Sequence, residues 1–323
     1  MDIDMLQRRA AIIRQVRSFF ESLNYLELDT PLLSPNLIPE SCLEVFRTER
    51  IFPHGSKKEK QPLWLIPSPE IYMKKIIGQH CVNVFQICKC FRNGESCGHL
   101  HNSEFTMLEY YTIDADYMDS LTLTEELINF LTTEGTENKD REKYIPFEHI
   151  TVAEAFSRYA GFDLFKTAAE GTEAMETQAK KLGLEPMPGL TVTQLYDLIF
   201  IHSVEPQLKT KKPIALIDYP AFVPCLAKKA NDGLTAERWE LYYDGIELAN
   251  CYSEETDILK IKEFFINEEA EKNRTAKVIH NIEHNYWKLP RCSGTAMGLD
   301  RLIMMLTGKK SIDGVLPFGT LPL

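Results

Sequence analysis

The dipeptide Asp-Gly at 244–245 lies between two runs in which apolar and polar residues alternate, 239–243 and 246–250. Asp-Gly between alternating runs is the strongest short-range signal for a β-hairpin, because the tight turn needs two residues in left-handed backbone conformations. Alternating runs at 82–91 and 105–112, joined by a polar loop, predict a second hairpin. Hairpins of this kind argue against a fold built from repeating βα units.

A helix is predicted to open the chain, because apolar residues recur near the helical period from Ile3 to Leu23. Asn24 marks its predicted end. The segment 115–210 is also mostly helical in pattern. Hairpins combined with packed helices predict an α+β fold with a mainly antiparallel sheet flanked by helices.

Another helix is predicted after the short strand 63–66. Ser68 is a good N-cap residue, and Pro69 suits the first helical position because its missing N–H would be unsatisfied there anyway. The helix is predicted over 71–77, and Gly78 would end it.

The composition is that of a globular protein and narrows its class. Lys and Arg total 36 against 47 Asp and Glu, a net charge of −11, and this acidic balance argues against a broad grip on nucleic acid. Eight cysteines in 323 residues do not make a disulfide scaffold. The sequence has no secretory signal and no apolar run long enough to span a membrane, which predicts a cytoplasmic protein with reduced thiols.

Arg92 lies where the predicted strand 82–91 enters a polar loop that contains His101. A single arginine at a strand end is usually only a surface charge. Here the return strand carries Glu109 and Tyr111 on one face, and a hairpin brings both strand ends to one place. Because a guanidinium binds phosphate through two parallel hydrogen bonds, Arg92 is a candidate phosphate ligand.

The stretch 294–301 combines small residues with an arginine at its end. One interpretation is a glycine-rich strand packed tightly against a helix. The other is a flat floor that a ring or a backbone can approach closely, since glycine has no side chain in the way. Arg301 would then stand near the start of a helix, where the backbone dipole also favours an anion.

Glu70, Glu247 and Glu254 are candidates for binding amines. Solvated surface charge is the simpler interpretation of each of them. If they line one pocket, two or three carboxylates would pair with a diamine, whereas a single one would suit a simple amine.

A metal site is an alternative interpretation of the loop that follows residue 88. Soft ligands occur there within a short span, at Cys88, Cys90, Cys97, His99 and His101. Structural zinc usually takes cysteines with about two to four residues between them. Cys88 and Cys90 instead share one face of a strand, and their spacing favours packing in the sheet.

Three linked motifs resemble the signatures of class II aminoacyl-tRNA synthetases in their lysyl form. The segment 29–33 is similar to the first signature, with its dimer-interface proline at Pro31. The segments 91–109 and 294–301 are similar to the second and the third. Their order and separations fit, and the resemblance covers essentially the whole chain.

Within that family, the segments 63–70, 245–250 and 292–294 resemble the short lysyl-synthetase paralogues that modify elongation factor P. This resemblance implies a single class II catalytic domain over 1–323 without an anticodon-binding domain, because the catalytic pattern begins at residue 29. It implies a homodimer that uses ATP and Mg²⁺ to activate (R)-β-lysine as an adenylate. The enzyme would then transfer it to a lysine side chain of elongation factor P, without tRNA.

The resemblance also implies a role for each matching position. Arg92 would hold the α-phosphate, Arg301 the far end of the triphosphate, and Glu247 would be the third catalytic residue and a ligand of Mg²⁺. Phe105 would stack on adenine. The residues expected to line the ATP site are Arg92, Asn93, Gly94, Asn102, Phe105, Glu247, Leu248, Gly298 and Arg301. Those expected to hold (R)-β-lysine are Ser68, Pro69, Glu70, Tyr111, Glu254 and Ala296.

The sequence departs from the family's pattern at several positions, and two other functions stay open. The loop from Arg92 to His101 is one residue longer than usual, and Ala296 stands where lysyl synthetases usually have glycine, which implies a reshaped amino-acid pocket. One alternative is a truncated synthetase that charges tRNA or another amine with lysine. The other is a regulatory paralogue that has lost catalysis, against which the intact Arg92, Glu247 and Arg301 argue.

Overall fold

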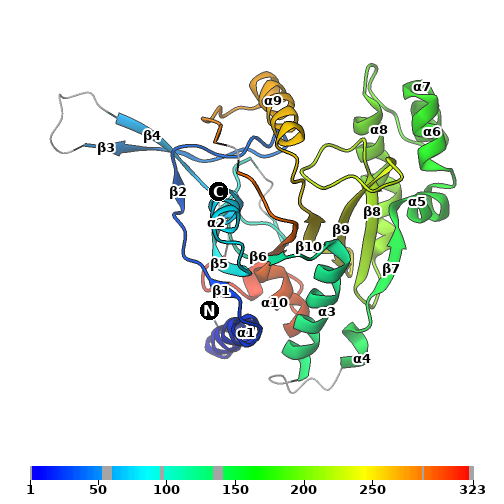
Figure 1. Ribbon diagram of the computed structural model, residues 1–323. Coiled ribbons are helices and arrows are strands. Elements are labelled where there is room, and N and C mark those ends of the chain that lie inside the picture. Colours follow the sequence, from blue (N-terminus) through cyan, green and yellow to red (C-terminus); the bar gives the residue numbers. More distant parts are fainter. Residues whose placement is uncertain (1, 53–59, 95–97, 134–140, 286, 320–323) are drawn as a thin grey trace. The chain divides into compact units, whose positions relative to one another are not determined.

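A computed structural model describes residues 2–52, 60–94, 98–133, 141–285 and 287–319 (Figure 1). The chain divides into two compact units. The first unit comprises the described residues of 1–115 and 254–323, and the second comprises those of 116–253.

The first unit carries four strands in the order β1-β5-β6-β11 and a separate sheet in the order β2-β4-β3. β1 pairs with β5 in parallel, while β6 pairs antiparallel with both β5 and β11. The bounds of the first set are Leu26–Glu27 for β1, Val84–Phe91 for β5, Glu104–Ile113 for β6 and Cys292–Gly298 for β11. Those of the second are Leu33–Ser34 for β2, Arg47–Ile51 for β3 and Lys60–Leu65 for β4.

The helices of the first unit are α1, α2, α9 and α10, with a short 3₁₀ turn after them. Their bounds are Ile3–Ser22 for α1, Glu70–His80 for α2, Ile258–Thr275 for α9, Leu299–Thr307 for α10 and Ile312–Gly314 for the 3₁₀ turn. Asn24 adopts a left-handed backbone with φ of 59° just after α1, so the predicted end of this helix is confirmed.

One face of β6 packs against α1. The ring of Phe20 in α1 lies 4.9 Å from that of Tyr110 and 5.0 Å from that of Phe85, measured between centroids. The hydroxyls of Tyr25 and Thr112 form a hydrogen bond of 2.7 Å. Because alternate residues of a strand point to opposite faces, this packing leaves the other face of β6 to the odd-numbered residues, as the alternation predicts.

The apolar pattern that predicts α1 does not mark its buried side at every position. Ile3 is 65% exposed and Leu23 is 41% exposed, whereas Arg9 is buried. The error has a physical cause, because an ion pair with Asp300 allows an arginine to face the core where the apolar pattern alone predicts a surface position.

The second unit has strands in the order β10-β9-β8-β7, antiparallel except for the parallel pair β7 and β8. The strand bounds are Glu148–Thr151 for β7, Ile214–Pro220 for β8, Thr235–Tyr243 for β9 and Ile246–Ser253 for β10. The α-helices are Tyr117–Thr133 for α3, Arg141–Tyr144 for α4, Val152–Ala155 for α5, Leu164–Glu170 for α6, Thr172–Lys181 for α7 and Val192–Ile199 for α8. π-Helical turns cover Phe156–Ala160 and Phe200–Val204, and a 3₁₀ turn covers Glu205–Leu208.

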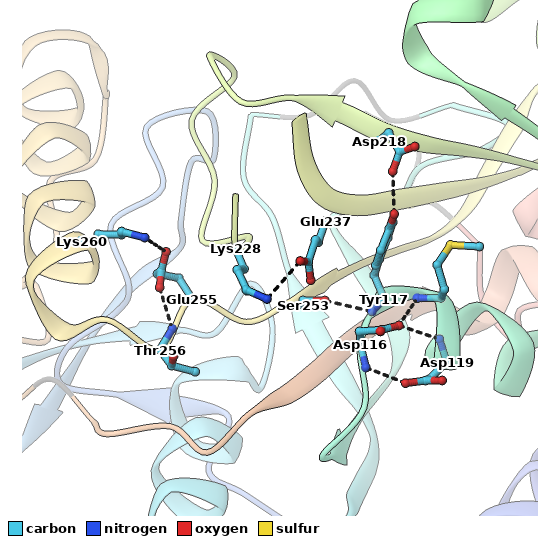
Figure 2. Close-up of polar contacts among 11 residues, drawn as sticks. Asp116, Tyr117, Asp119, Asp218, Lys228, Glu237, Ser253, Glu255, Thr256 and Lys260 are labelled. Atoms are coloured by element: carbon cyan, nitrogen blue, oxygen red, sulfur yellow. Dashed lines mark hydrogen bonds and ion pairs between the residues drawn. The ribbon is translucent and has the colours of Figure 1, made fainter. Parts of the chain in front are cut away.

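The predicted hairpin of β9 and β10 is present, with Asp244 and Gly245 at φ of 50° and 76° in its turn. Tyr117, at the start of α3, fastens this helix to the sheet of the second unit (Figure 2). Its hydroxyl donates to Asp218 at 2.6 Å and its backbone N–H donates to the hydroxyl of Ser253 at 3.0 Å.

The α+β prediction with a mainly antiparallel sheet is confirmed, and the end of α2 is a correction. The helix continues through Gly78 to His80, and Cys81 takes the left-handed conformation after it. The small size of Gly78 serves packing, because a Cβ there would stand in tight contact with the carbonyl oxygen of Lys288, at 3.1 Å. Among the described residues, no helix is long and apolar enough to cross a membrane.

Candidate active site

The predicted phosphate ligands follow two strands of the first unit that end at the same edge. β5 ends at Phe91, which pairs with Glu104, and β11 ends at Gly298, which pairs with Met107. β6 lies between these two strands. Arg92 and Arg301 therefore leave the same end of the sheet on either side of β6.

Arg92 is held against an aromatic ring. Its guanidinium carbon lies 5.3 Å from the centroid of the Phe105 ring, and its backbone N–H donates to the carbonyl of Ser103 at 3.0 Å. A guanidinium over an aromatic face is attracted to the ring, which restricts its orientation. The side chains of Phe105 and Arg92 are thus in contact at the beginning of β6.

The loop after Arg92 is anchored by Asn93. Its backbone N–H donates to the carbonyl of Glu44 at 2.9 Å, and its side-chain oxygen accepts from the backbone N–H of Gly94 at 2.9 Å. Gly94 has φ of 74°, which favours glycine. In this structure Asn93 and Gly94 therefore shape the loop; Glu95 and Cys97 lie outside the described residues.

Arg301 contacts the far part of the same loop. Its terminal nitrogen lies 2.8 Å from Nε2 of His101, and its Nε donates to the carbonyl of Leu100 at 3.4 Å. Gly298 precedes α10, and a Cβ on it would meet the Arg301 side chain at 3.5 Å. Asn102, which follows His101, is half-buried. The part of the loop around His101 thus contacts Arg301.

A group of acidic side chains lies around the beginning of α2. Pro69, and not Ser68 as predicted, is the N-cap of this helix, and the Ser68 hydroxyl accepts a hydrogen bond from the backbone N–H of Glu70 at 3.3 Å. One turn later, Nζ of Lys74 lies 2.5 Å from Oε1 of Glu70 and 2.7 Å from Oε2 of Glu254. Two of the predicted amine ligands are therefore joined through a lysine.

The backbone around Glu254 is fixed from both sides. Its N–H donates to the carbonyl of Cys292 in β11 at 2.9 Å. In the next residue, the Glu255 carboxylate accepts from the N–H of Thr256 at 3.0 Å and pairs with Lys260 at 3.1 Å (Figure 2). These bonds hold the turn that leads from Glu254 into α9.

Gly294 lies against the acidic side chains near the beginning of α2, and its small size leaves room for them. Gly294 pairs with Tyr111, and Ala296 pairs with Glu109, on neighbouring strands. A Cβ on Gly294 would stand 2.4 Å from Cε1 of Tyr111 and 2.8 Å from Oε1 of Glu254, so any other residue would displace them. The hydroxyl of Tyr111 donates to Oε1 of Glu109 at 2.9 Å.

Burial and mutual repulsion raise the pKa of these acids. The pKa of Glu254 rises from 4.5 to about 7 because of burial and the charge of Glu70, and the charge of Lys74 opposes the rise. Burial and the charge of Glu70 likewise hold the pKa of Glu109 well above its usual value, opposed by the Tyr111 hydrogen bond and by Lys74. Strongly shifted carboxyls that share one site are typical of a functional centre.

Sequence comparisons agree with this geometry. The family model described as tRNA synthetases class II (D, K and N) matches residues 3–322. The chain belongs to this class II synthetase family. Three similar proteins are named elongation factor P–(R)-β-lysine ligase. The one from Avibacterium paragallinarum is 34% identical over 98% of this chain and 95% of its own length. Those from Vibrio atlanticus (98% and 95%) and from Buchnera aphidicola subsp. Schizaphis graminum (97% and 94%) are each 33% identical.

Two predicted residues of this class II synthetase lie in the second unit. Glu247 is half-buried on β10, and Leu248 is 2% exposed in the β-bulge between Glu247 and Ala249. The residues that the structure brings together around Lys74 and at the edge of β6 are those of the first unit.

The alternative interpretation of the segment after residue 88 as a zinc site gains no support from the described residues. Among the described residues, no group of three or more His, Cys, Asp or Glu is arranged to hold a metal ion. Sγ of Cys88 lies 3.8 Å from Sγ of Cys90 within β5, which agrees with their predicted place in the sheet.

Sequence reasoning missed three residues. Lys74 follows Glu70 by four positions, a helical spacing that indicates contact. Glu109 alternates with Tyr111 and was not assigned to the substrate. The third is Glu40, whose pKa is raised to about 7 by burial and by the charge of Glu70, while Arg92 and Lys272 lower it. Lys272 donates to the carbonyl of Glu40 at 2.8 Å, a contact that no local pattern indicates.

Proposed function

We propose that this chain is an ATP-dependent ligase that activates (R)-β-lysine as an adenylate and transfers it to a lysine side chain of elongation factor P. The observation that carries the proposal is that one face of β6 has an aromatic and cationic part at its beginning and an acidic part further along. Phe105 and Arg92 lie at the beginning of β6, and Glu109 and Tyr111 follow on the same face beside Glu254. Such a face suits a molecule with a nucleotide at one end and amines at the other.

The spacing along β6 supports this division. Glu109 lies four positions after Phe105, a distance of about 13 Å at the rise of an extended strand. An adenine ring on Phe105 would leave this length for the phosphate and the aminoacyl chain. The carboxylates would then receive the amines of β-lysine, with its carboxylate directed toward Arg92.

In the first step the substrate carboxylate attacks the α-phosphorus of ATP and displaces pyrophosphate. Arg92 would neutralise charge at the α-phosphate, and Arg301 would bind the leaving end. Because both guanidiniums are held by neighbouring groups, they are in place before the reaction, and positioning of this kind lowers the barrier.

In the second step the acceptor amine attacks the carbonyl of the adenylate. A new amide forms, AMP leaves, and the amine loses a proton. A lysine amine has an ordinary pKa of about 10.4, so it must reach the adenylate in its neutral form. The relatives' names support elongation factor P as the acceptor.

The other nucleotide contacts follow from the matching positions. We assign ATP binding to Asn93, Gly94, Asn102, Leu248 and Gly298, in addition to the groups above. Mg²⁺ is commonly held by one or two carboxylates together with substrate phosphates, and the half-buried carboxylate of Glu247 fits that donor set. Bound there, the ion would add positive charge to the phosphates.

The amino-acid contacts are assigned in the same way. Ser68, Pro69, Glu70, Tyr111, Glu254 and Ala296 would hold (R)-β-lysine, and we add Glu109. Ala296 lies opposite Glu109 in the register of β6 and β11, so its methyl group would narrow the space beside this carboxyl. A single catalytic domain over 1–323, a homodimer, a cytoplasmic location and independence from tRNA stay predictions.

The test is amino-acid-dependent exchange of pyrophosphate into ATP. We expect exchange with (R)-β-lysine, and label transferred from it to elongation factor P but not to tRNA. Exchange with α-lysine and transfer to tRNA would favour a truncated synthetase instead. Absence of exchange with both amino acids would favour the third possibility, a regulatory paralogue that has lost catalysis.

Arg92→Ala serves as the loss-of-function variant in this assay. It should abolish exchange, because the attack on the α-phosphate loses its main counter-charge. Arg47→Ala is the matched control, since Arg47 is an exposed arginine in the separate sheet. Equal exchange by both variants would contradict the proposal.

A further inference from the structure

A lysine ammonium is buried among the carboxylates that would bind the substrate amines. The Lys74 side chain is only 1% exposed, and it bridges Glu70 and Glu254 at 2.5 Å and 2.7 Å. Taking a charge out of water costs several kcal/mol, so a buried ammonium needs close partners. The charges of both partners raise the pKa of Lys74, which keeps it protonated.

The bridge occupies only one oxygen of Glu254. Lys74 takes Oε2, while Oε1 lies over Gly294, beside the Tyr111 ring. Both carboxylate oxygens are buried and accept no hydrogen bond from the described residues, but only Oε2 has an ion-pair partner. A buried carboxylate oxygen without a donor is costly, and a ligand N–H would satisfy it. Oε1 of Glu254, the oxygen that Lys74 does not bind, therefore faces Gly294.

We propose that Lys74 is a positioning residue: its ammonium is a permanent internal counter-ion that favours the charged form of Glu254 and turns Oε1 toward the amine of the substrate. This inference rests on the proposed function. Lys74 touches no reacting atom in it, and its effect is on the binding of the amino acid.

The groups that face Glu254 come from three elements. Among the described residues they are Glu70 and Lys74 from α2, Tyr111 from β6 and Cys292 from β11, while Glu109 of β6 interacts with the charges of Glu70 and Lys74. Lys74 is the cation that lowers the pKa of Glu254, whereas Glu70 and burial raise it. Removing the ammonium should therefore raise the pKa of Glu254 above about 7, and the carboxyl would be neutral at physiological pH.

The variant is Lys74→Met, which keeps the length of the chain and removes the charge. At pH 7 its KM for (R)-β-lysine in pyrophosphate exchange should rise by about tenfold or more, and kcat should change less. The pH at which binding is half-maximal should move upward by about one unit. The KM for ATP should stay within about twofold.

Two controls accompany it. Lys75→Met removes the next lysine of α2, which pairs with Glu283 instead, and should leave both the KM and the pH profile unchanged. Lys74→Arg keeps the charge and should restore most of the lost affinity. A folded Lys74→Met protein with an unchanged KM and pH profile would overturn the proposal, as would equal rises in KM for ATP and β-lysine.

A second design covers loss of folding, because removing one partner of a buried ion pair is often strongly destabilising. Glu254→Gln is compared with the double variant Lys74→Met/Glu254→Gln, in which no charge at 254 needs a counter-ion. If Lys74 acts through Glu254, the two proteins should have the same KM within about threefold. A further large loss in the double variant would contradict that route.

A third measurement separates this inference from the proposed function. The Glu254 carboxyl is titrated by ¹³C NMR in the protein without substrate, and Glu254→Gln identifies its signal. Lys74→Met should raise the titration midpoint whatever the enzyme's substrate is. If the wild-type protein shows no pyrophosphate exchange, only the proposed function is refuted. If the titration midpoint of Glu254 is the same in Lys74→Met as in the wild type, the role of Lys74 is refuted.

Discussion

The carboxylate of Asp300 lies 2.6 Å from the guanidinium of Arg9, and both side chains are buried. Asp300 also accepts the backbone N–H of Thr106 at 2.7 Å, and Arg9 donates to the Thr106 hydroxyl at 3.0 Å. One carboxylate thus joins α10 to α1 and to the strand that carries Phe105. Because Arg301 stands next to Asp300, this pair also fixes the start of the helix that presents Arg301.

Arg9→Met is expected to destabilise the protein by about 3–5 kcal/mol, because it leaves the Asp300 charge buried without its partner. Urea unfolding followed by circular dichroism measures the loss. Arg8→Met is the control, since Arg8 is exposed on the same helix, and it should change stability by about 0.5 kcal/mol or less. Similar losses in both variants would show that the buried pair contributes little.

Gly294→Ala is expected to impair amino-acid binding selectively. The added methyl group would stand 2.4 Å from the Tyr111 ring and 2.8 Å from the Glu254 carboxylate, and both must move. We expect the KM for (R)-β-lysine to rise roughly 10- to 100-fold, as displacements of about 1 Å in a site can cost that much. Pyrophosphate exchange at varied β-lysine and ATP measures it.

Gly314→Ala is the matched control for that variant. A Cβ at 314 would make only ordinary contact with Lys309 at 3.5 Å, so exchange should be unaffected. An unchanged KM for β-lysine in Gly294→Ala would mean that the space beside Gly294 is not the amino-acid site.

Local sequence signals predicted the strands and turns that carry the site. The Asp-Gly turn and the alternation of β6 depend on neighbouring residues, and both are present as predicted. Gly78 was misread because its small size serves contact with Lys288, far along the chain, and not the end of a helix. The exposed Ile3 and the buried Arg9 likewise reflect partners that no local pattern reveals.

The site was predictable to the extent that its residues belong to recognisable motifs. Arg92 follows the end of β5 and Arg301 lies in the first turn of the helix after β11, and the register brings the ends of these strands to one edge. Lys74 carries no motif of its own, since a lysine in a helix is ordinarily exposed. Its function as a counter-ion depends on Glu254, which joins it only through the tertiary fold.

Phe105→Leu should weaken ATP binding without changing the affinity for β-lysine. Loss of an aromatic platform under a base costs about 1–3 kcal/mol, so the KM for ATP should rise roughly tenfold. The same change removes the ring over which the Arg92 guanidinium lies, at 5.3 Å, so kcat should fall as well. Exchange kinetics measure both, with Phe318→Leu as a control at a residue that is 78% exposed. An unchanged KM for ATP would place adenine elsewhere.

The raised pKa of Glu254 predicts how stability depends on pH. The folded protein binds the proton of this carboxyl more tightly than the unfolded chain, with a pKa of about 7 against 4.5. The protonated group therefore favours the fold below pH 4.5, and this contribution, about 3 kcal/mol, is lost as the pH rises through about 7. Glu254→Gln mimics the neutral form and should keep the contribution at every pH. Urea unfolding at pH 5, 6, 7 and 8 should show the wild type losing stability relative to Glu254→Gln across this range. A constant difference between the two proteins would mean that Glu254 titrates alike in the folded and unfolded states.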